Sequence, residues 1–197
     1  MSPAELAPPP ARPAIAVFCG ARPGHDPRYL ALAHAAGVGL ARHGFTVVYG
    51  GGSVGMMGAL AEGALGAGGE VIGVIPSVLV AREAGHTRLT RLEVVPDMSV
   101  RKQRMNALAS GYLVLPGGLG TLDELFEVLT LRQIGLHAHP VVAVSEGGYF
   151  DALAAVLQGF VAAGLAAPHN VEALELYPDL GAALTRLATA RLHPGVA

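Results

Sequence analysis

Short β-rich stretches alternate with helical patterns along almost the whole chain, and this alternation limits the possible folds more than any other feature. The β-rich stretches are Ala14–Cys19, Phe45–Tyr49, Val71–Ile75, Leu92–Val95, Tyr112–Leu115, Val141–Val144 and Leu174–Tyr177. The helical patterns cover about 27–43, 54–67, 97–110, 121–136, 149–163 and 179–191. Such alternation predicts a parallel sheet with helices on both faces. We therefore expect an α/β fold, a doubly wound and Rossmann-like sheet whose ligand lies beyond the carboxyl ends of the strands.

Length and composition are those of one domain. The 197 residues are 52% hydrophobic and only 14% charged, yet no apolar run reaches the ~18 residues that a membrane helix needs. The excess of apolar residues is expected to cover both faces of the sheet and an oligomer interface. The sequence predicts a single domain over 14–192, between a flexible proline-rich tail at 1–13 and a flexible tail at 193–197.

Charge and cysteine content limit the partners and the compartment. The formal net charge of −2 gives no electrostatic basis for binding nucleic acid or a membrane surface, so we expect neither as a partner. Cys19 is the only cysteine, which rules out an intrachain disulfide and agrees with a cytoplasmic location. A negatively charged ligand must therefore be bound by local features.

One such feature is the glycine-rich stretch Leu115–Glu124, which follows a β-rich run and opens a helical pattern. Glycines allow backbone N–H groups to approach an anion, and the helix dipole favours negative charge there, so a phosphate is the expected guest. Thr121 and Glu124 also have the spacing of a capping box, which would assign both side chains to helix capping. A carboxylate beside a phosphate is unfavourable unless it faces another part of the ligand, which gives Glu124 a possible catalytic role.

A second glycine loop, Gly50–Gly55, fits the pattern G-x-G-x-x-G between a strand and a helix. A dinucleotide site also needs an acid at the carboxyl end of the next strand. That strand, Val71–Ile75, is followed by Pro76, and Glu70 precedes it. The pattern favours a mononucleotide phosphate and its ribose in a cleft between the two loops, although glycines required only for strand–helix packing remain an alternative.

The helical pattern at 97–110, which precedes the loop Leu115–Glu124, carries a charge inside an apolar stripe. Met98, Arg101, Met105 and Leu108 fall within an arc of about 80° at helical spacing. An unpaired guanidinium there is costly, so Arg101 is expected either in a structural ion pair or in a ligand-binding or catalytic role. A solvated basic face accounts for the flanking side chains of Lys102 and Arg104.

Taken together, these motifs resemble the LOG ("lonely guy") family of cytokinin riboside 5′-monophosphate phosphoribohydrolases, whose members have often been called lysine decarboxylases. The resemblance runs from Val17 to about Gly164. Its most specific part is the loop Pro116–Glu124, of the form PGGxGTxxE, after a helix with adjacent arginine and lysine. The other matching stretches are Val48–Gly52, Gly55–Gly58, Gly69–Pro76 and Gln133–His137.

The resemblance implies hydrolysis of the N-glycosidic bond of a cytokinin or purine nucleoside 5′-monophosphate, without metal or organic cofactor, by a homodimer. It implies that Arg101 and Glu124 are catalytic. The implied substrate-binding residues are Gly51, Gly52, Met98, Lys102, Gly117, Gly118, Gly120 and Thr121. Within this set Gly118, Gly120 and Thr121 would hold the 5′-phosphate.

This chain departs from the family pattern at several positions. The serines after the first Cys-Gly are Ala21 and Arg22, the His-Glu pair of plant-like members is Ser99-Val100, and an aspartate before the glycine-loop strand is Ser110. A lysine near the end of the histidine loop is His139. These changes leave Arg101 and Glu124 in place and bear mainly on the preferred base.

The residues give less support to three other functions. A pyridoxal-phosphate decarboxylase needs a Schiff-base lysine, and Lys102 is the only lysine. His137 and His139 have no matching acid or cysteine cluster for a metal, so a loop or packing role is expected. A non-catalytic carrier of a phosphate-bearing ligand, comparable to the molybdenum-cofactor carriers, remains the main alternative; Arg101 and Glu124 favour the enzyme.

Overall fold

A computed structural model describes residues 7–80 and 86–190 of the chain. It contains one sheet of seven parallel strands in the order β4-β3-β2-β1-β5-β6-β7. The strands are β1 (Ala14–Phe18), β2 (Thr46–Tyr49), β3 (Val71–Pro76), β4 (Arg91–Val95), β5 (Gly111–Val114), β6 (Val141–Val144) and β7 (Leu174–Tyr177). The predicted doubly wound α/β fold is therefore confirmed, and every predicted strand is present.

The helices lie between these strands. They are α1 (Arg28–Arg42), α2 (Gly55–Gly66), α3 (Ser77–Val80), α4 (Met98–Leu108), α5 (Leu119–Gln133), α6 (Asp151–Ala162), α7 (Pro168–Glu172) and α8 (Leu180–Thr189), with a 3-10 turn at Glu146–Gly148. The short α3 and α7 were not predicted, because four or five residues are too few to show a helical period. No helix within 7–80 and 86–190 is long and apolar enough to cross a membrane.

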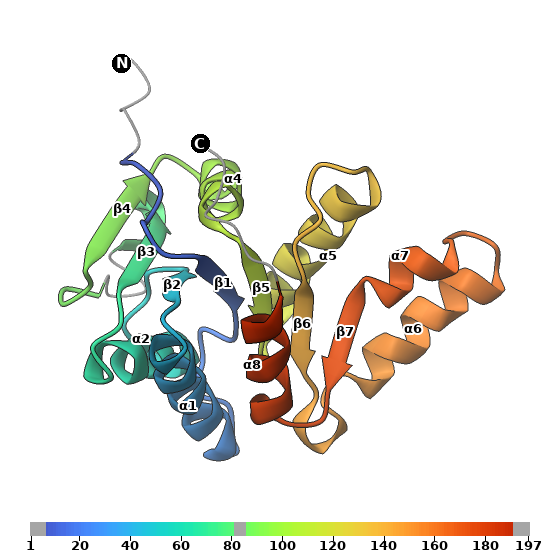
Figure 1. The fold of residues 1–197 in the computed structure, drawn as a ribbon, viewed down its shortest axis with the longest axis horizontal. Helices are drawn as coiled ribbons and strands as arrows, with labels where there is room; N and C mark the ends of the chain where they lie inside the picture. The colour runs from blue at the N-terminus through green and yellow to red at the C-terminus, as the bar shows by residue number, and fades with distance from the viewer. Residues whose placement is uncertain (1–6, 81–85, 191–197) are drawn as a thin grey trace.

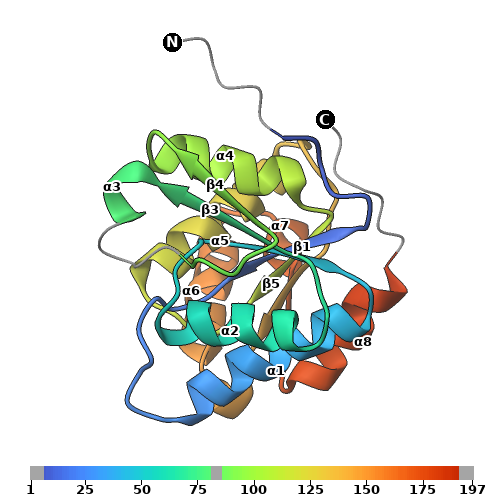
Figure 2. The same ribbon diagram turned by 90° about the vertical axis from the view of Figure 1, so that its left-hand side faces the viewer.

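Helices cover both faces of the sheet, as Figures 1 and 2 show, and a hydrophobic core lies on each face. One core packs α1, α2 and α8 against side chains such as Val47 and Leu113. The other packs α4 and α5 against side chains such as Val48 and Val114. Strands β1, β2, β3, β5 and β6 are fully buried, as expected for a parallel sheet covered on both faces.

The edge strands carry the charges of the sheet. Arg104 of α4 lies beside β4, where its Nε donates to Glu93 at 2.7 Å, and its guanidinium also donates to the carbonyl of Ala7. The prediction of a solvated face is thus wrong for Arg104, which is buried. Arg91 donates to the carbonyl of Pro8, so this part of the predicted tail lies along the domain. Residues 1–6 and 193–197 of the predicted tails fall outside the described residues.

The strand order creates the site where the ligand is expected. Successive strands from β1 to β4 extend in one direction, and the chain then returns to place β5 on the other side of β1. The helices that follow β1 and β5 therefore cover opposite faces of the sheet. The loops that lead into these helices diverge at the carboxyl ends of the two strands. The loops after β1, β2 and β5 surround this opening.

Candidate active site

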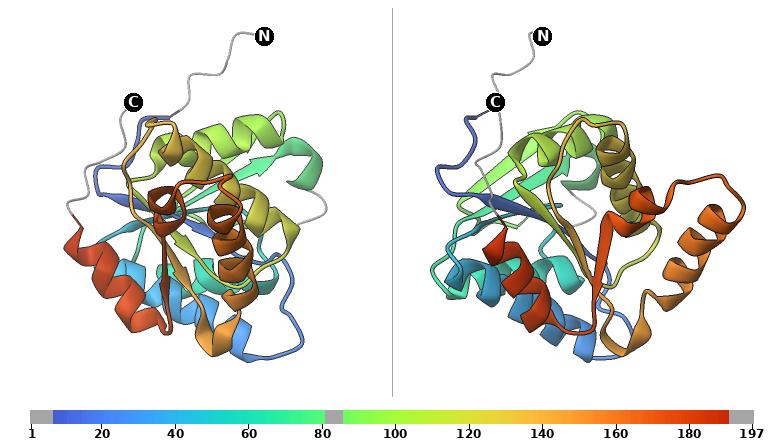
Figure 3. Two further views of the ribbon diagram at one scale, coloured as in Figure 1. Left: turned by 90° about the vertical axis from the view of Figure 1, so that its right-hand side faces the viewer. Right: turned by 45° about the vertical axis from the view of Figure 1, so that its right-hand side comes forward.

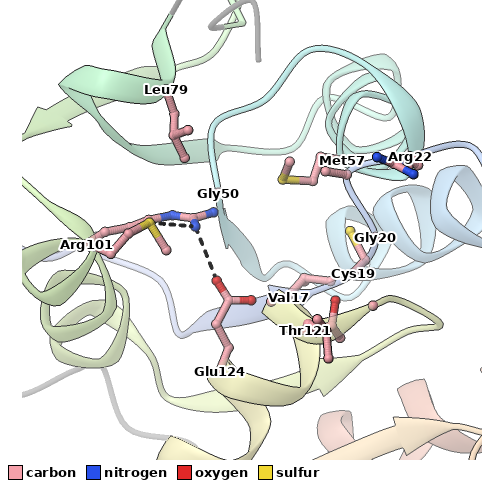
Figure 4. Close-up of a pocket in the computed structure, with 15 residues that line it drawn as sticks. Val17, Cys19, Gly20, Arg22, Gly50, Met57, Leu79, Arg101, Thr121 and Glu124 are labelled. Carbon is pink, nitrogen blue, oxygen red and sulfur yellow. Dashed lines mark hydrogen bonds and ion pairs between the residues drawn. The ribbon is translucent and has the colours of Figure 1, made fainter. Parts of the chain in front are cut away.

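A cavity of about 580 Å³ opens at the carboxyl ends of β1, β2 and β5 (Figure 4). Both glycine loops contribute to it, through Gly50 and through Gly118 and Gly120. The predicted catalytic pair lies in its wall. The complete lining is Val17, Cys19, Gly20, Ala21, Arg22, Gly50, Met57, Leu79, Met98, Arg101, Gly118, Leu119, Gly120, Thr121 and Glu124.

Arg101 reaches the cavity from the buried side of α4. The helix begins at Met98 after Asp97, whose carboxylate accepts from the backbone N–H of Val100 at 2.9 Å. The Nε of Arg101 donates to the carbonyl of Val74 at 3.1 Å, and the side chain is only 7% exposed. A side chain at position 50 would collide with the guanidinium, so Gly50 is required for Arg101 to lie in the wall.

Glu124 faces Arg101 from the second turn of α5. Arg101 Nη1 lies 3.5 Å from Glu124 Oε1, and both side chains are nearly buried. Figure 4 shows this ion pair at the cavity surface. The separation is long for a charge-assisted hydrogen bond, so the two groups form an ion pair without a short hydrogen bond between these atoms.

The start of α5 corrects the capping-box interpretation. The helix begins at Leu119, with Gly118 as its N-cap and no side chain bonded to its first turn. Thr121 is therefore inside the helix, not its cap, and Glu124 one turn further does not cap it. The N–H groups of the first turn have no partner within the helix, which leaves them available to an anion.

Thr121 and the remaining predicted phosphate residues surround this helix start. Thr121 is buried, and any side chain at position 117 would collide with its hydroxyl group. Gly117 itself lines a neighbouring, smaller cavity, whereas Gly118 lines both. The structure thus brings together Arg101, Glu124, Met98, Gly118, Gly120 and Thr121 of the predicted site residues.

Three predicted site residues lie behind the cavity or outside its wall. A side chain at position 51 would press on Ile75, and the carbonyl of Gly52 accepts from the hydroxyl group of Tyr49 at 3.0 Å. Lys102 points away, with its ammonium group 3.0 Å from Asp123. A hydrogen bond to Glu127 is the main cause of the raised pKa of Lys102. Direct substrate contact by Gly51, Gly52 or Lys102 stays an untested prediction.

Cys19 lies in the cavity wall next to the charged pair. Burial of its thiol, followed by the nearby negative charge of Glu124, raises the pKa of Cys19 far above its ordinary value, while Arg101 opposes this shift. The thiol is therefore neutral at physiological pH and supplies no thiolate nucleophile.

The other features that the sequence singled out have structural roles. Glu70 precedes β3 and accepts from the hydroxyl group of Thr46 at 2.9 Å, at the end of the sheet remote from the cavity. The Nε2–H of His137 donates to the carbonyl of Val128 at 2.9 Å, and its ring stacks on that of His139. Burial lowers the pKa of both histidines.

The sequence reasoning missed Arg22 and most of the apolar wall. Leu79 comes from the short helix α3, Met57 from α2, and Leu119 is the variable residue of the glycine loop. Arg22 and Leu79 both follow the carboxyl end of a strand. The rule that ligands bind at the carboxyl ends of strands could therefore have identified them as candidate site residues.

Fold and cavity together define the class of the protein: a Rossmann-like α/β protein with a cleft suited to a nucleotide. A family model described as "Possible lysine decarboxylase" matches residues 57–187. The chain belongs to this family, the LOG family of cytokinin riboside 5′-monophosphate phosphoribohydrolases.

Relatives of this name match over most of their length. The chain is 40% identical to the cytokinin riboside 5′-monophosphate phosphoribohydrolase of Rhodococcoides fascians, covering 88% of each chain. It is 41% identical to the enzyme of the same name from Mycobacterium tuberculosis, covering 88% of this chain and 92% of that one. Among solved structures, the molybdenum cofactor carrier protein of Chlamydomonas reinhardtii matches with a TM-score of 0.67 at 23% identity, over 89% of this chain and 96% of that one. At that identity the likeness concerns the fold alone.

Proposed function

We propose that this protein hydrolyses the N-glycosidic bond of a purine or cytokinin nucleoside 5′-monophosphate, releasing the free base and ribose 5-phosphate. The observation that carries the proposal is the nearly buried pair of Arg101 and Glu124 in the cavity wall, beside the uncapped start of α5. The relatives at about 40% identity are named for this reaction.

Glu124 is the group proposed to act on the reacting sugar. As the base leaves, the ribose becomes oxocarbenium-like and its positive charge is stabilised by a nearby carboxylate. The same carboxylate can accept a proton from the attacking water as the water oxygen bonds to C1 of the ribose. The bond between C1 and the base breaks, and the departing base takes up a proton. Arg101 holds the carboxylate in place through the ion pair.

The two ends of the substrate are proposed to meet different parts of the wall. The 5′-phosphate lies at the start of α5, whose first residues, Leu119 to Thr121, line the cavity and have backbone N–H groups without a partner inside the helix. The base lies against the apolar side chains of Met57, Leu79, Met98 and Leu119. A flat, largely apolar base fits such a surface better than a charged amino acid does.

The lysine decarboxylase description does not fit the cavity as well. Lys102 is the only lysine of the chain, and its ammonium group is held by Asp123 and Glu127 outside the cavity lining. A Schiff-base lysine has to be unprotonated and next to the cofactor. The raised pKa of Lys102 acts against the first condition.

Purified protein incubated with AMP or N6-isopentenyl-AMP in EDTA is expected to release free base, measured by chromatography. Metal removal is expected to leave the rate unchanged, because the proposed mechanism uses only protein side chains. The ratio of the two rates reports the base preference. Binding of both nucleotides without release of base would instead identify a carrier of the same fold.

We also propose that the protein is a cytoplasmic homodimer with no nucleic-acid or membrane partner. The single cysteine and the net charge of −2 support the location and the absence of these partners. The dimer is supported by α6, a largely apolar helix that stands beyond edge strand β7 with only Leu157 buried (Figure 3). Large exposed apolar side chains on α5 and α6, and in the segments that follow them, are Phe126, Ile134, Leu136, Val156, Phe160 and Leu165.

Light scattering after size exclusion is expected to give twice the chain mass of 20.0 kDa. Val156→Lys combined with Phe160→Lys is expected to give a monomer, because burying two ammonium groups in an apolar interface is costly. Val94→Lys on edge strand β4 alters an equally exposed valine at the opposite end of the sheet and is expected to leave the dimer intact. A wild-type mass of 20.0 kDa would contradict the dimer.

A further inference from the structure

Arg22 is a cation of the cavity wall that nothing else in the described structure neutralises. The guanidinium forms no hydrogen bond or ion pair with residues 7–80 or 86–190. The other arginine of the wall, Arg101, faces Glu124 and so contributes little net charge. Figure 4 shows Arg22 on the opposite side of the cavity from this pair. The cavity therefore has an excess positive charge on one side.

The loop that carries Arg22 is fixed between the two glycine loops. The N–H of Gly20 donates to the carbonyl of Pro116 at 3.1 Å, which ties the loop to the end of β5. A side chain at position 55 would collide with the carbonyl of Ala21, so Gly55 lets the loop Gly50–Gly55 pack on the same segment. The backbone at Arg22 is thus held by contacts on both sides, whereas its side chain is exposed.

Arg22 also lines a second cavity. A smaller cavity of about 180 Å³ adjoins the first, and the two share Gly20, Arg22 and Gly118. Gly118 is the N-cap of α5, so the shared region is next to the free N–H groups of the helix start. An anion in this position would have backbone donors on one side and a guanidinium on the other.

We infer that Arg22 binds the 5′-phosphate of the substrate opposite the start of α5 and so makes the enzyme select nucleoside monophosphates over free nucleosides. This inference rests on the proposed function. A phosphate monoester carries a charge of about −1.5 to −2 at neutral pH, which a helix start alone only partly balances. A guanidinium can bind two phosphate oxygens at once, whereas an ammonium group acts as a single point charge.

Arg22→Ala is expected to raise KM for AMP roughly 10- to 100-fold with a smaller change in kcat, because phosphate binding is lost before the chemical step. The affinity for ribose 5-phosphate, measured by calorimetry, is expected to fall by a similar factor, and that for adenosine to stay unchanged. Arg22→Lys is expected to be intermediate. Arg42→Ala, at the far end of α1, removes the same charge remote from the cavity and is expected to behave as wild type.

Calorimetry separates this inference from the proposed function, since ribose 5-phosphate binding needs no turnover. Equal affinity of wild type and Arg22→Ala for ribose 5-phosphate would overturn the role of Arg22 even in an active enzyme. So would an equal loss for adenosine, because Arg22 would then contact the nucleoside. If the wild-type protein releases no base but Arg22→Ala lowers the affinity for ribose 5-phosphate, the result would support the phosphate site and refute the proposed hydrolase activity.

Discussion

Glu124→Gln is expected to lower kcat for base release by roughly 10²- to 10⁴-fold, the usual effect of removing a general base or a charge that stabilises the transition state. Glutamine has the same shape, so the cavity is kept, but it neither takes a proton from water nor balances an oxocarbenium-like ribose. The carboxylate is nearly buried, so bulk water does not replace it. Chromatographic assay of AMP hydrolysis measures the loss.

The matched control is Glu127→Gln, one turn further along α5. Its carboxylate pairs with Lys102 outside the lining of the main cavity, so the same loss of charge is expected to leave kcat nearly unchanged. The Glu124→Gln variant is expected to bind AMP about as well as wild type, because the phosphate contacts lie at the start of the helix. Retention of more than about a tenth of the wild-type kcat by Glu124→Gln would contradict a direct role of the carboxylate.

The strands of this fold were predictable from the sequence because each is a short apolar run bounded by glycine, proline or charge. Burial on both faces of a parallel sheet requires such runs. The helix ends were less predictable. The start of α5 was placed at Thr121 because a capping box gives a strong local signal, whereas Gly118 caps the helix without a side-chain bond. A side-chain cap would occupy N–H groups that the proposed phosphate site needs free.

The placement of Arg101 and Glu124 at the cavity was predictable because a charge in an apolar stripe and a carboxylate after a glycine turn both conflict with plain packing. Residues that obey ordinary packing rules carried no such signal. Leu79 and Met57 look like core residues in the sequence, and only the fold brings them to the cavity. The sequence associates Lys102 with the site because it is next to Arg101. Adjacent residues of a helix point in different directions, however, and Lys102 instead contacts Asp123.

Gly50→Ala is expected to lower kcat/KM by roughly 10²-fold without removing any charged group. The new methyl group would occupy the space of the Arg101 guanidinium and would also press on the sulfur of Met57. The guanidinium is the movable partner, so it is expected to shift away from Glu124, and displacements of about 1 Å in an active site have effects of this size. Gly66→Ala, in open space at the end of α2, is the matched control and is expected to keep full activity.

The double variant tests whether Gly50 acts through Arg101. Arg101→Ala removes the guanidinium and leaves Glu124 nearly buried without this partner, so it is expected to reduce activity at least as strongly. In the absence of the guanidinium, the nearest remaining contact of the methyl group of Gly50→Ala is the sulfur of the flexible Met57 side chain, which can move aside. The double variant is therefore expected to be no worse than Arg101→Ala alone. Additive losses would mean that Gly50 contributes independently of Arg101, for example by direct contact with the substrate. Comparison of the two single variants with the double variant thus shows whether Gly50 makes room for Arg101 or contacts the substrate.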